Sequence, residues 1–185
     1  MRYLSYLAPA PVPLVLLERI ERFSQPDGSE DLQLAVDELE SVSLATRLRT
    51  FADSDTEVLA HRLMLAYVQA GETEADQTTL VHQLFTALQT EMTAVLENNL
   101  DVGAKLHAFR RHAVHLFAND VFQPMFRYSL AIQLVLTDLI QGRFREARDW
   151  AQIALELSDT VELPDGTLPE GATAADLGKL LLIRA

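Results

Sequence analysis

The residues best suited to chemistry are concentrated in one short segment, 105–115. At 100° per residue, His107, Arg111 and His115 recur every fourth position and fall on one face of a helix, opposite an apolar stripe. Such a face can be a solvated surface, can bind a carboxylate-bearing partner, or can supply ligands to a metal ion. The sequence leaves these three interpretations open, and the same segment also contains Lys105, Arg110 and His112.

A metal site is the most specific of these interpretations. His112 and His115 lie three residues apart, so both imidazoles can reach one ion from a helix. Glu91 or Glu97 of the preceding predicted helix could add ligands, but spacing identifies no third ligand and no H-E-x-x-H pattern occurs. We therefore predict no metal and no cofactor. The alternative function is a helical metal-binding or small-molecule-binding protein that uses His107, His112 and His115.

Most enzyme chemistries lack their residues in this chain. It has no cysteine, which excludes disulfides, thiolate nucleophiles and cysteine-ligated metal centres. The run Asp53-x-Asp55-x-Glu57 lacks the glycine and the distal glutamate of a calcium loop, and is better explained by a helix start. No G-x-S-x-G, P-loop or dinucleotide fingerprint occurs. We predict a protein that is not an enzyme.

Charge is negative overall and unevenly distributed. The net charge is −12 and the pI is near 4.7, and a chain of this kind repels the phosphates of nucleic acids. Residues 27–101 carry −12, whereas residues 105–148 carry +4. The two parts can attract each other within one chain or between two copies. We expect no nucleic-acid partner, and a homodimer stays open.

Aromatic side chains gather directly after the histidine-rich segment. Five of them fall between residues 109 and 128, and Trp150 comes one predicted helix later. Aromatic residues dominate helical interiors, so a core is the simpler interpretation and a ligand pocket is the alternative. Trp150 can instead project into an interface, where tryptophan is favoured. The five residues are Phe109, Phe117, Phe122, Phe126 and Tyr128.

The N-terminal segment superficially resembles a secretion signal. Pro9, Pro11 and Pro13 interrupt its apolar run, and no small-x-small cleavage site precedes Glu18. No stretch of the sequence approaches the ~18 apolar residues that span a membrane. We expect a soluble, cytoplasmic protein without a membrane partner.

Apolar residues recur at helical spacing along most of the chain, and caps such as Ser54 and Thr73 separate the segments. In the helix that starts at Ser54, the apolar stripe expected to face inward is Leu59, Leu63, Ala66 and Ala70. Nothing alternates at period two for long enough to predict a sheet. The predicted fold class is all-α, with eight or nine helices in antiparallel pairs. The predicted helices span about 13–24, 30–42, 44–51, 54–70, 74–98, 102–117, 124–141, 144–158 and 173–184.

The chain length fits one main domain. We assign residues 1–158 to this helical domain. Residues 159–172 contain two prolines and two glycines and are predicted to form a loop. Residues 173–185 are predicted to form a last helix, packed on the same domain or on a partner.

Residues 129–159 resemble a tetratricopeptide-type repeat, a helix–turn–helix unit in which small residues fix close helix contacts. Gly142 sits where the chain must reverse with positive φ, and Phe144 opens the second helix. A partial match covers residues 60–71, where Gly71 ends the first helix. The resemblance departs from the pattern after that, since Asp76 and Gln83 occupy positions of small residues. The matching residues are Leu63, Ala66, Tyr67 and Gly71 in the partial unit, and Gly142, Phe144, Ala147, Ala151, Ala154 and Leu157 in the complete one.

The resemblance implies a function in binding. Tetratricopeptide proteins typically hold peptides or partner helices on a concave surface and do no chemistry. The positions of the family's carboxylate clamp, near Ile132 and Leu136, are apolar here. A groove in this chain should therefore prefer an apolar or amphipathic segment.

The sequence as a whole favours a non-enzymatic protein–protein interaction module, bacterial in style. It would act as an adaptor, a chaperone-like escort or a regulatory subunit, with another protein or a peptide as its partner. Apolar burial would supply the affinity, and the uneven charge would set the orientation. The residues predicted to contact the partner are His107, Arg111, His115, Phe126 and Trp150.

Overall fold

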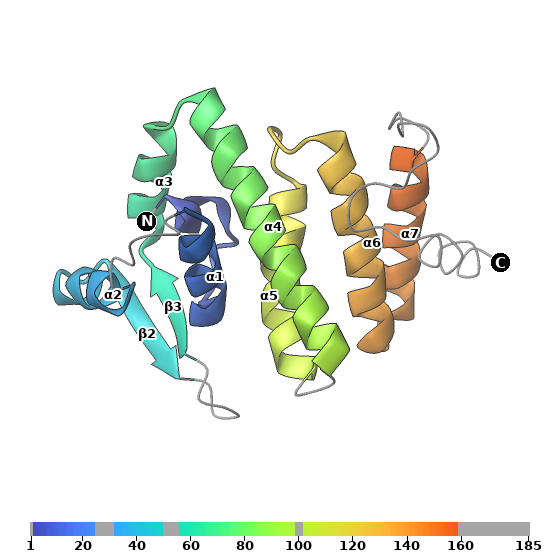
Figure 1. The fold of residues 1–185 in the computed structure, drawn as a ribbon, viewed down its shortest axis with the longest axis horizontal. Coiled ribbons are helices and arrows are strands. Elements are labelled where there is room, and N and C mark those ends of the chain that lie inside the picture. The colour runs from blue at the N-terminus through green and yellow to red at the C-terminus, as the bar shows by residue number, and fades with distance from the viewer. Residues whose placement is uncertain (1, 25–31, 50–55, 99–101, 159–185) are drawn as a thin grey trace.

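The computed structural model describes residues 2–24, 32–49, 56–98 and 102–158 (Figure 1). The predicted loop 159–172 and the predicted helix 173–185 lie outside this range. Within it the chain is mostly helical, as predicted. None of the described helices is both long and apolar enough to cross a membrane.

Four helices after residue 73 lie side by side and form the larger part of the molecule (Figure 1). Contacts join each of them to the next along the chain, and α4 also contacts α6. They are α4 (Glu74–Asn98), α5 (Val102–Phe117), α6 (Pro124–Ile140) and α7 (Phe144–Ser158). The N-terminal part adds η1 (Tyr3–Tyr6), α1 (Leu14–Ser24), α2 (Leu32–Ser41) and α3 (Arg62–Ala70).

A small sheet stands in place of the predicted helix 44–51 and of the first part of the predicted helix 54–70. Its three strands are β1 (Val12–Pro13), β2 (Ala45–Arg49) and β3 (Thr56–Ala60), in the antiparallel order β1-β3-β2. Ala45 pairs with Ala60, and Val12 pairs with Val58. The predicted helix 44–51 is therefore wrong, and so is the first part of the predicted helix 54–70, whereas its predicted cap at Ser54 lies outside the described residues. Strands of two to five residues are too short to display alternation, and the second partner of β3 is β1, with Val12 lying 46 positions before Val58.

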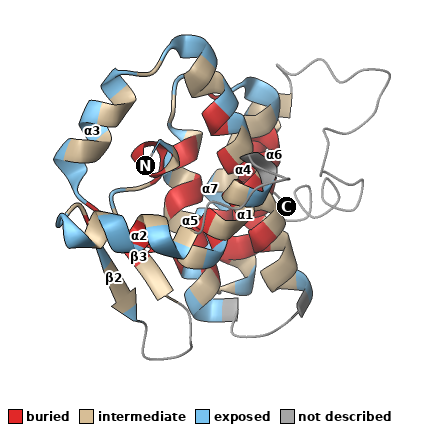
Figure 2. Ribbon diagram, turned by 60° about the vertical axis from the view of Figure 1, so that its left-hand side comes forward, coloured by how far each residue is buried: buried red, intermediate tan, exposed pale blue. Residues whose placement is uncertain are grey.

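Helix α3 presents to solvent the stripe that was predicted to face inward. Leu63 is 76% exposed and Tyr67 is 80% exposed, and Ala66 and Ala70 are exposed beside them. Figure 2 shows no buried residue on this helix. The opposite side of α3 lies against the N-terminal turn η1. The predicted inward stripe is therefore wrong, and the chain forms β3 where the first turns of that helix were expected.

The core is built around α4. Its Leu84, Ala87, Leu88 and Met92 are completely buried, between α1 on one side and α5 and α6 on the other. Thr73 accepts a hydrogen bond from the backbone N–H of Asp76, 3.2 Å away, and caps this helix as the sequence predicted.

The turn between α6 and α7 has the geometry that its glycine permits. Gly142 has a φ of +71°, and Ala147, Ala151 and Ala154 are buried against α6. The small side chains allow the two helix backbones to lie close together. Phe144, in contrast, is 69% exposed at the start of α7.

Candidate functional site

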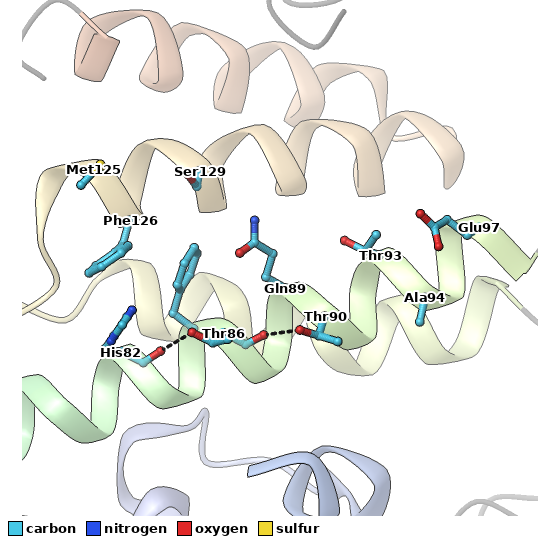
Figure 3. Close-up of a pocket in the computed structure, with 11 residues that line it drawn as sticks. His82, Thr86, Gln89, Thr90, Thr93, Ala94, Glu97, Met125, Phe126 and Ser129 are labelled. Carbon is cyan, nitrogen blue, oxygen red and sulfur yellow. Dashed lines mark hydrogen bonds between the residues drawn. The ribbon is translucent and has the colours of Figure 1, made fainter. Parts of the chain in front are cut away.

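A groove with a volume of about 700 Å³ opens between α4 and α6 (Figure 3). We call it the α4–α6 groove. Helix α4 supplies most of its wall and the first turns of α6 supply the rest. Its lining residues are His82, Phe85, Thr86, Gln89, Thr90, Thr93, Ala94, Glu97, Met125, Phe126 and Ser129.

One end of the groove is aromatic. The imidazole of His82 stacks on the ring of Phe126, with centroids 4.6 Å apart and an interplanar angle of 22°. Phe126 also contacts Phe85 and Phe122, at centroid distances of 5.1 Å and 6.1 Å. Phe85 and Phe122 are buried, whereas Phe126 is half-buried and Met125 is 40% exposed beside it. An apolar ligand can therefore bury further aromatic surface here.

The middle of the α4 wall is formed by two small side chains, Thr86 and Thr90, beside the longer Gln89 (Figure 3). The Thr86 hydroxyl donates to the carbonyl oxygen of His82 at 3.1 Å, and the Thr90 hydroxyl donates to that of Thr86 at 2.8 Å (Figure 3). Both hydroxyl protons are thus used within the helix. The wall can accept an apolar surface without leaving these donors unpaired.

The far end of the groove is polar. Glu97 lines it and is exposed. Between the two ends, the buried amide of Gln133 lies 3.5 Å from the Thr93 hydroxyl and links α6 to α4. The groove therefore changes along its length from aromatic, through small side chains, to a carboxylate.

The predicted histidine-rich face lies on α5, away from the groove lining. His107 is exposed, and its Nδ1 accepts a hydrogen bond from an Arg143 Nη2 2.8 Å away at the start of α7. Partial desolvation, with Arg143, Arg111 and Arg110 nearby, lowers the pKa of His107. This environment keeps the imidazole neutral near pH 7.

His112 has a structural environment. It is completely buried, and its Nε2 lies 3.0 Å from the carbonyl oxygen of Pro11. Burial lowers its pKa to about 4, so the ring is neutral and donates from Nε2. The contact ties the N-terminal segment to α5, because Pro11 directly precedes β1.

The side chains that the alternative, metal-binding function would use as ligands do not lie together in the structure. His112 is engaged with Pro11, and His115 is exposed. Glu91 holds Arg19 of α1 at 2.6 Å, whereas Glu97 lies in the groove. Among the residues that the structure describes, no group of three His, Cys, Asp or Glu side chains could hold a metal ion.

Of the residues predicted to contact a partner, Phe126 lines the groove. Trp150 is half-buried and lies edge-on against Phe117, with centroids 5.0 Å apart. Arg111 is half-buried on α5, and its Nε is buried without a hydrogen-bond partner. The groove thus brings Phe126 together with residues that sequence reasoning missed.

A signal for the missed residues was present in the sequence. His82, Thr86, Thr90 and Ala94 recur every fourth position of a helix that is otherwise rich in leucine. That spacing places polar or small residues along one face. The pattern shows that this face of α4 does not pack into the core, but it gives no sign that α6 lies opposite.

The comparisons add no relative. No protein-family model matches the chain, and no similar curated protein or solved structure was found.

Proposed function

We propose that this protein is a non-enzymatic protein–protein interaction module, which binds an apolar or amphipathic segment in the α4–α6 groove. The observation that carries the proposal is the change in side-chain chemistry along that groove, from an aromatic end to a carboxylate. An aromatic end at Phe85 and Phe126 can bury large apolar side chains, and small side chains at Thr86, Thr90 and Ala94 can admit a helix backbone. In this role the protein would serve as a cytoplasmic adaptor, chaperone-like escort or regulatory subunit.

The lining residues do not favour catalysis. Two of them have side chains that could act as an acid or a base, His82 and Glu97. They are fifteen residues apart on one straight helix, so their backbones are separated by about 22 Å. Acid–base catalysis needs both groups within hydrogen-bonding reach of one substrate, and this separation exceeds that reach.

The proposal includes the repeat-like architecture suggested by the sequence. In it, α6 and α7 form one helix pair of tetratricopeptide type, joined at Gly142 and packed through alanines. Antiparallel pairing of the helices, as in a degenerate array, would make the α4–α6 groove the concave surface. Ile132 and Leu136, at the positions of the family's carboxylate clamp, pack in the cluster between α6 and α7 and do not line this groove.

Site-specific photo-crosslinking tests the function. A benzophenone amino acid at Thr90 in the groove, introduced in the native host, should give a discrete protein adduct of defined mass. The same amino acid at Glu146, on the exposed surface of α7, is the matched control. Sequencing the cross-linked peptide should reveal an amphipathic segment. Equal adducts from both positions, or a small-molecule adduct at Thr90, would contradict the proposal.

A further inference from the structure

We infer that the α4–α6 groove binds, in the same chain, the segment 177–184, so that this segment competes with any external partner. The inference rests on the proposed function, because it uses the same groove and the same kind of ligand. Four observations carry it: the position of the end of α7, the length of the intervening chain, the apolar pattern of the segment, and the charge at the polar end of the groove.

The chain leaves the described structure at the right place. Helix α7 ends at Ser158, and its last turns pack against α6, since Ala154 and Leu157 belong to the cluster that also contains Tyr128 and Ala131. Figure 1 shows that the end of α7 and the starts of α4 and α6 lie at the same end of the molecule. The aromatic end of the groove lies there too, because Phe126 belongs to the first turn of α6.

The intervening chain is long enough to reach the groove. Residues 159–172 can span up to about 45 Å when extended. The groove itself follows α4 for about 22 Å between His82 and Glu97. The segment can therefore enter at the aromatic end and continue toward Glu97 without displacing α7.

The segment has the pattern of a groove-binding helix. Leu177, Leu180 and Leu181 fall on one face at i, i+3 and i+4, and Arg184 follows on that face at i+7. The groove has the complementary order, with small and apolar side chains first and the Glu97 carboxylate last. Placing Arg184 opposite Glu97 sets Leu177 opposite Thr90 and Leu181 opposite Ala94, because the spacings in the two helices are equal.

Disulfide trapping tests this register directly, since the natural chain has no cysteine that could interfere. Two matched double variants are made in the full chain, Thr90→Cys with Leu177→Cys, and Ala94→Cys with Leu181→Cys. The crossed pairs, Thr90→Cys with Leu181→Cys and Ala94→Cys with Leu177→Cys, contain the same positions offset by one turn. Matched pairs should oxidise about tenfold faster than crossed pairs, because only they hold both sulfur atoms close together.

The products distinguish the occupants of the groove. An intramolecular disulfide in the matched pairs supports the inference, whereas a disulfide-linked dimer at low protein concentration would show that a second copy donates the segment and would overturn it. Faster oxidation of the crossed pairs, or equal rates in all four variants, would overturn it as well. Circular dichroism of each reduced variant verifies that the helices are retained.

Hydrogen exchange on the natural chain gives a measurement that needs no substitution. Amides of residues 177–184 should exchange more slowly in the full chain than in a synthetic peptide of residues 173–185. Exchange at the same rate would overturn the inference. If the disulfides fail to form but photo-crosslinking at Thr90 gives a partner adduct, only the intramolecular ligand is rejected. If the disulfides fail to form and no partner adduct appears, the proposed function is rejected as well.

Discussion

At the scale of single residues, the histidines of α5 have different environments although they share a short stretch of sequence. His112 is buried and bonded to Pro11, His107 accepts from Arg143, and His115 is exposed. A half-turn of helix separates an interior position from a solvent position. Residue type alone therefore indicates little about the role of each imidazole.

The buried imidazole of His112 should make stability depend on pH. Its folded-state pKa of about 4 lies below the ordinary 6.5, so the unfolded chain binds the proton more tightly. The neutral His112 ring therefore contributes to the stability of the folded state fully above pH 6.5, and this stabilisation is lost as the pH falls toward 4. The unfolding free energy of the natural chain should fall between pH 7 and pH 4.5. In His112→Gln that fall should be smaller by about 2 to 3 kcal/mol.

Urea unfolding at the two pH values measures this difference. His115→Gln is the matched control, since that ring is exposed, and it should remove much less of the pH dependence. An equal pH dependence in the natural chain and in His112→Gln would contradict the assignment of a neutral buried imidazole.

A second residue-scale prediction concerns the ion pair between α5 and α6. Two nitrogens of Arg110, Nε and Nη2, donate hydrogen bonds to the Asp138 carboxylate at 2.6 Å and 2.8 Å. Asp138 is completely buried. Arg110→Ala leaves that charge unpaired, and should lower the unfolding free energy by about 3 to 5 kcal/mol. Arg145→Ala, on the exposed start of α7, should change it by less than about 0.5 kcal/mol.

A double replacement distinguishes the stability lost by leaving Asp138 unpaired from the stability that the ion pair itself contributes. Arg110→Met with Asp138→Leu removes both charges and keeps apolar volume, so most of the lost stability should return. Chemical denaturation of the three variants gives the comparison. A double variant as unstable as Arg110→Ala would indicate that the pair itself is required.

At the scale of secondary-structure elements, backbone conformation distinguishes two glycines that look alike in the sequence. Gly142 joins α6 to α7 with a φ of +71°, whereas Gly103 lies in the first turn of α5. A Cβ at either position would meet no atom within 4 Å. Any difference between them must therefore come from the backbone.

Alanine substitutions should accordingly have opposite signs at these two positions. Gly142→Ala places a side chain in the left-handed region and should destabilise the protein by about 1 to 2 kcal/mol. Gly103→Ala should stabilise it by up to about 1 kcal/mol, because alanine favours the helix and restricts the unfolded chain. Thermal unfolding followed by circular dichroism measures both, and equal effects would contradict the backbone argument.

At the scale of the whole molecule, one core unites the N-terminal elements with the helices after residue 73. It extends continuously from Leu4 through α4 to Leu134 of α6, and a second cluster joins α6 to α7. Trp150 contacts both clusters. Arginines from the first 26 residues pair with carboxylates of the acidic segment 27–101, as Arg19 of α1 pairs with Glu91 of α4 and Arg2 pairs with Glu72.

A shared core predicts cooperative unfolding. Leu88→Ala, at a completely buried position of α4, should cost about 2 to 5 kcal/mol. It should shift equally the transitions seen by Trp150 fluorescence, the single tryptophan of the chain, and by far-UV circular dichroism. Leu34→Ala, at a position that is 57% exposed, should shift neither by more than about 0.5 kcal/mol. Separate midpoints for the two probes would indicate independent halves.

The sequence by itself determined the elements whose cause is local. Helical periodicity and end signals predicted α4 within one residue of its bounds, with its cap at Thr73, and also α6 and α7 with their turn at Gly142. These features depend on residues within a few positions of one another, so a linear reading can recognise them.

Only the tertiary structure decided the features that join distant residues. Strand β3 pairs with β1 across 46 positions of the chain, Val58 with Val12, and the apolar stripe of α3 faces outward. The α4–α6 groove likewise depends on bringing His82 against Phe126 across 44 positions of the chain. Pairing and packing of this kind are set by the whole fold, because no short stretch of sequence contains both partners.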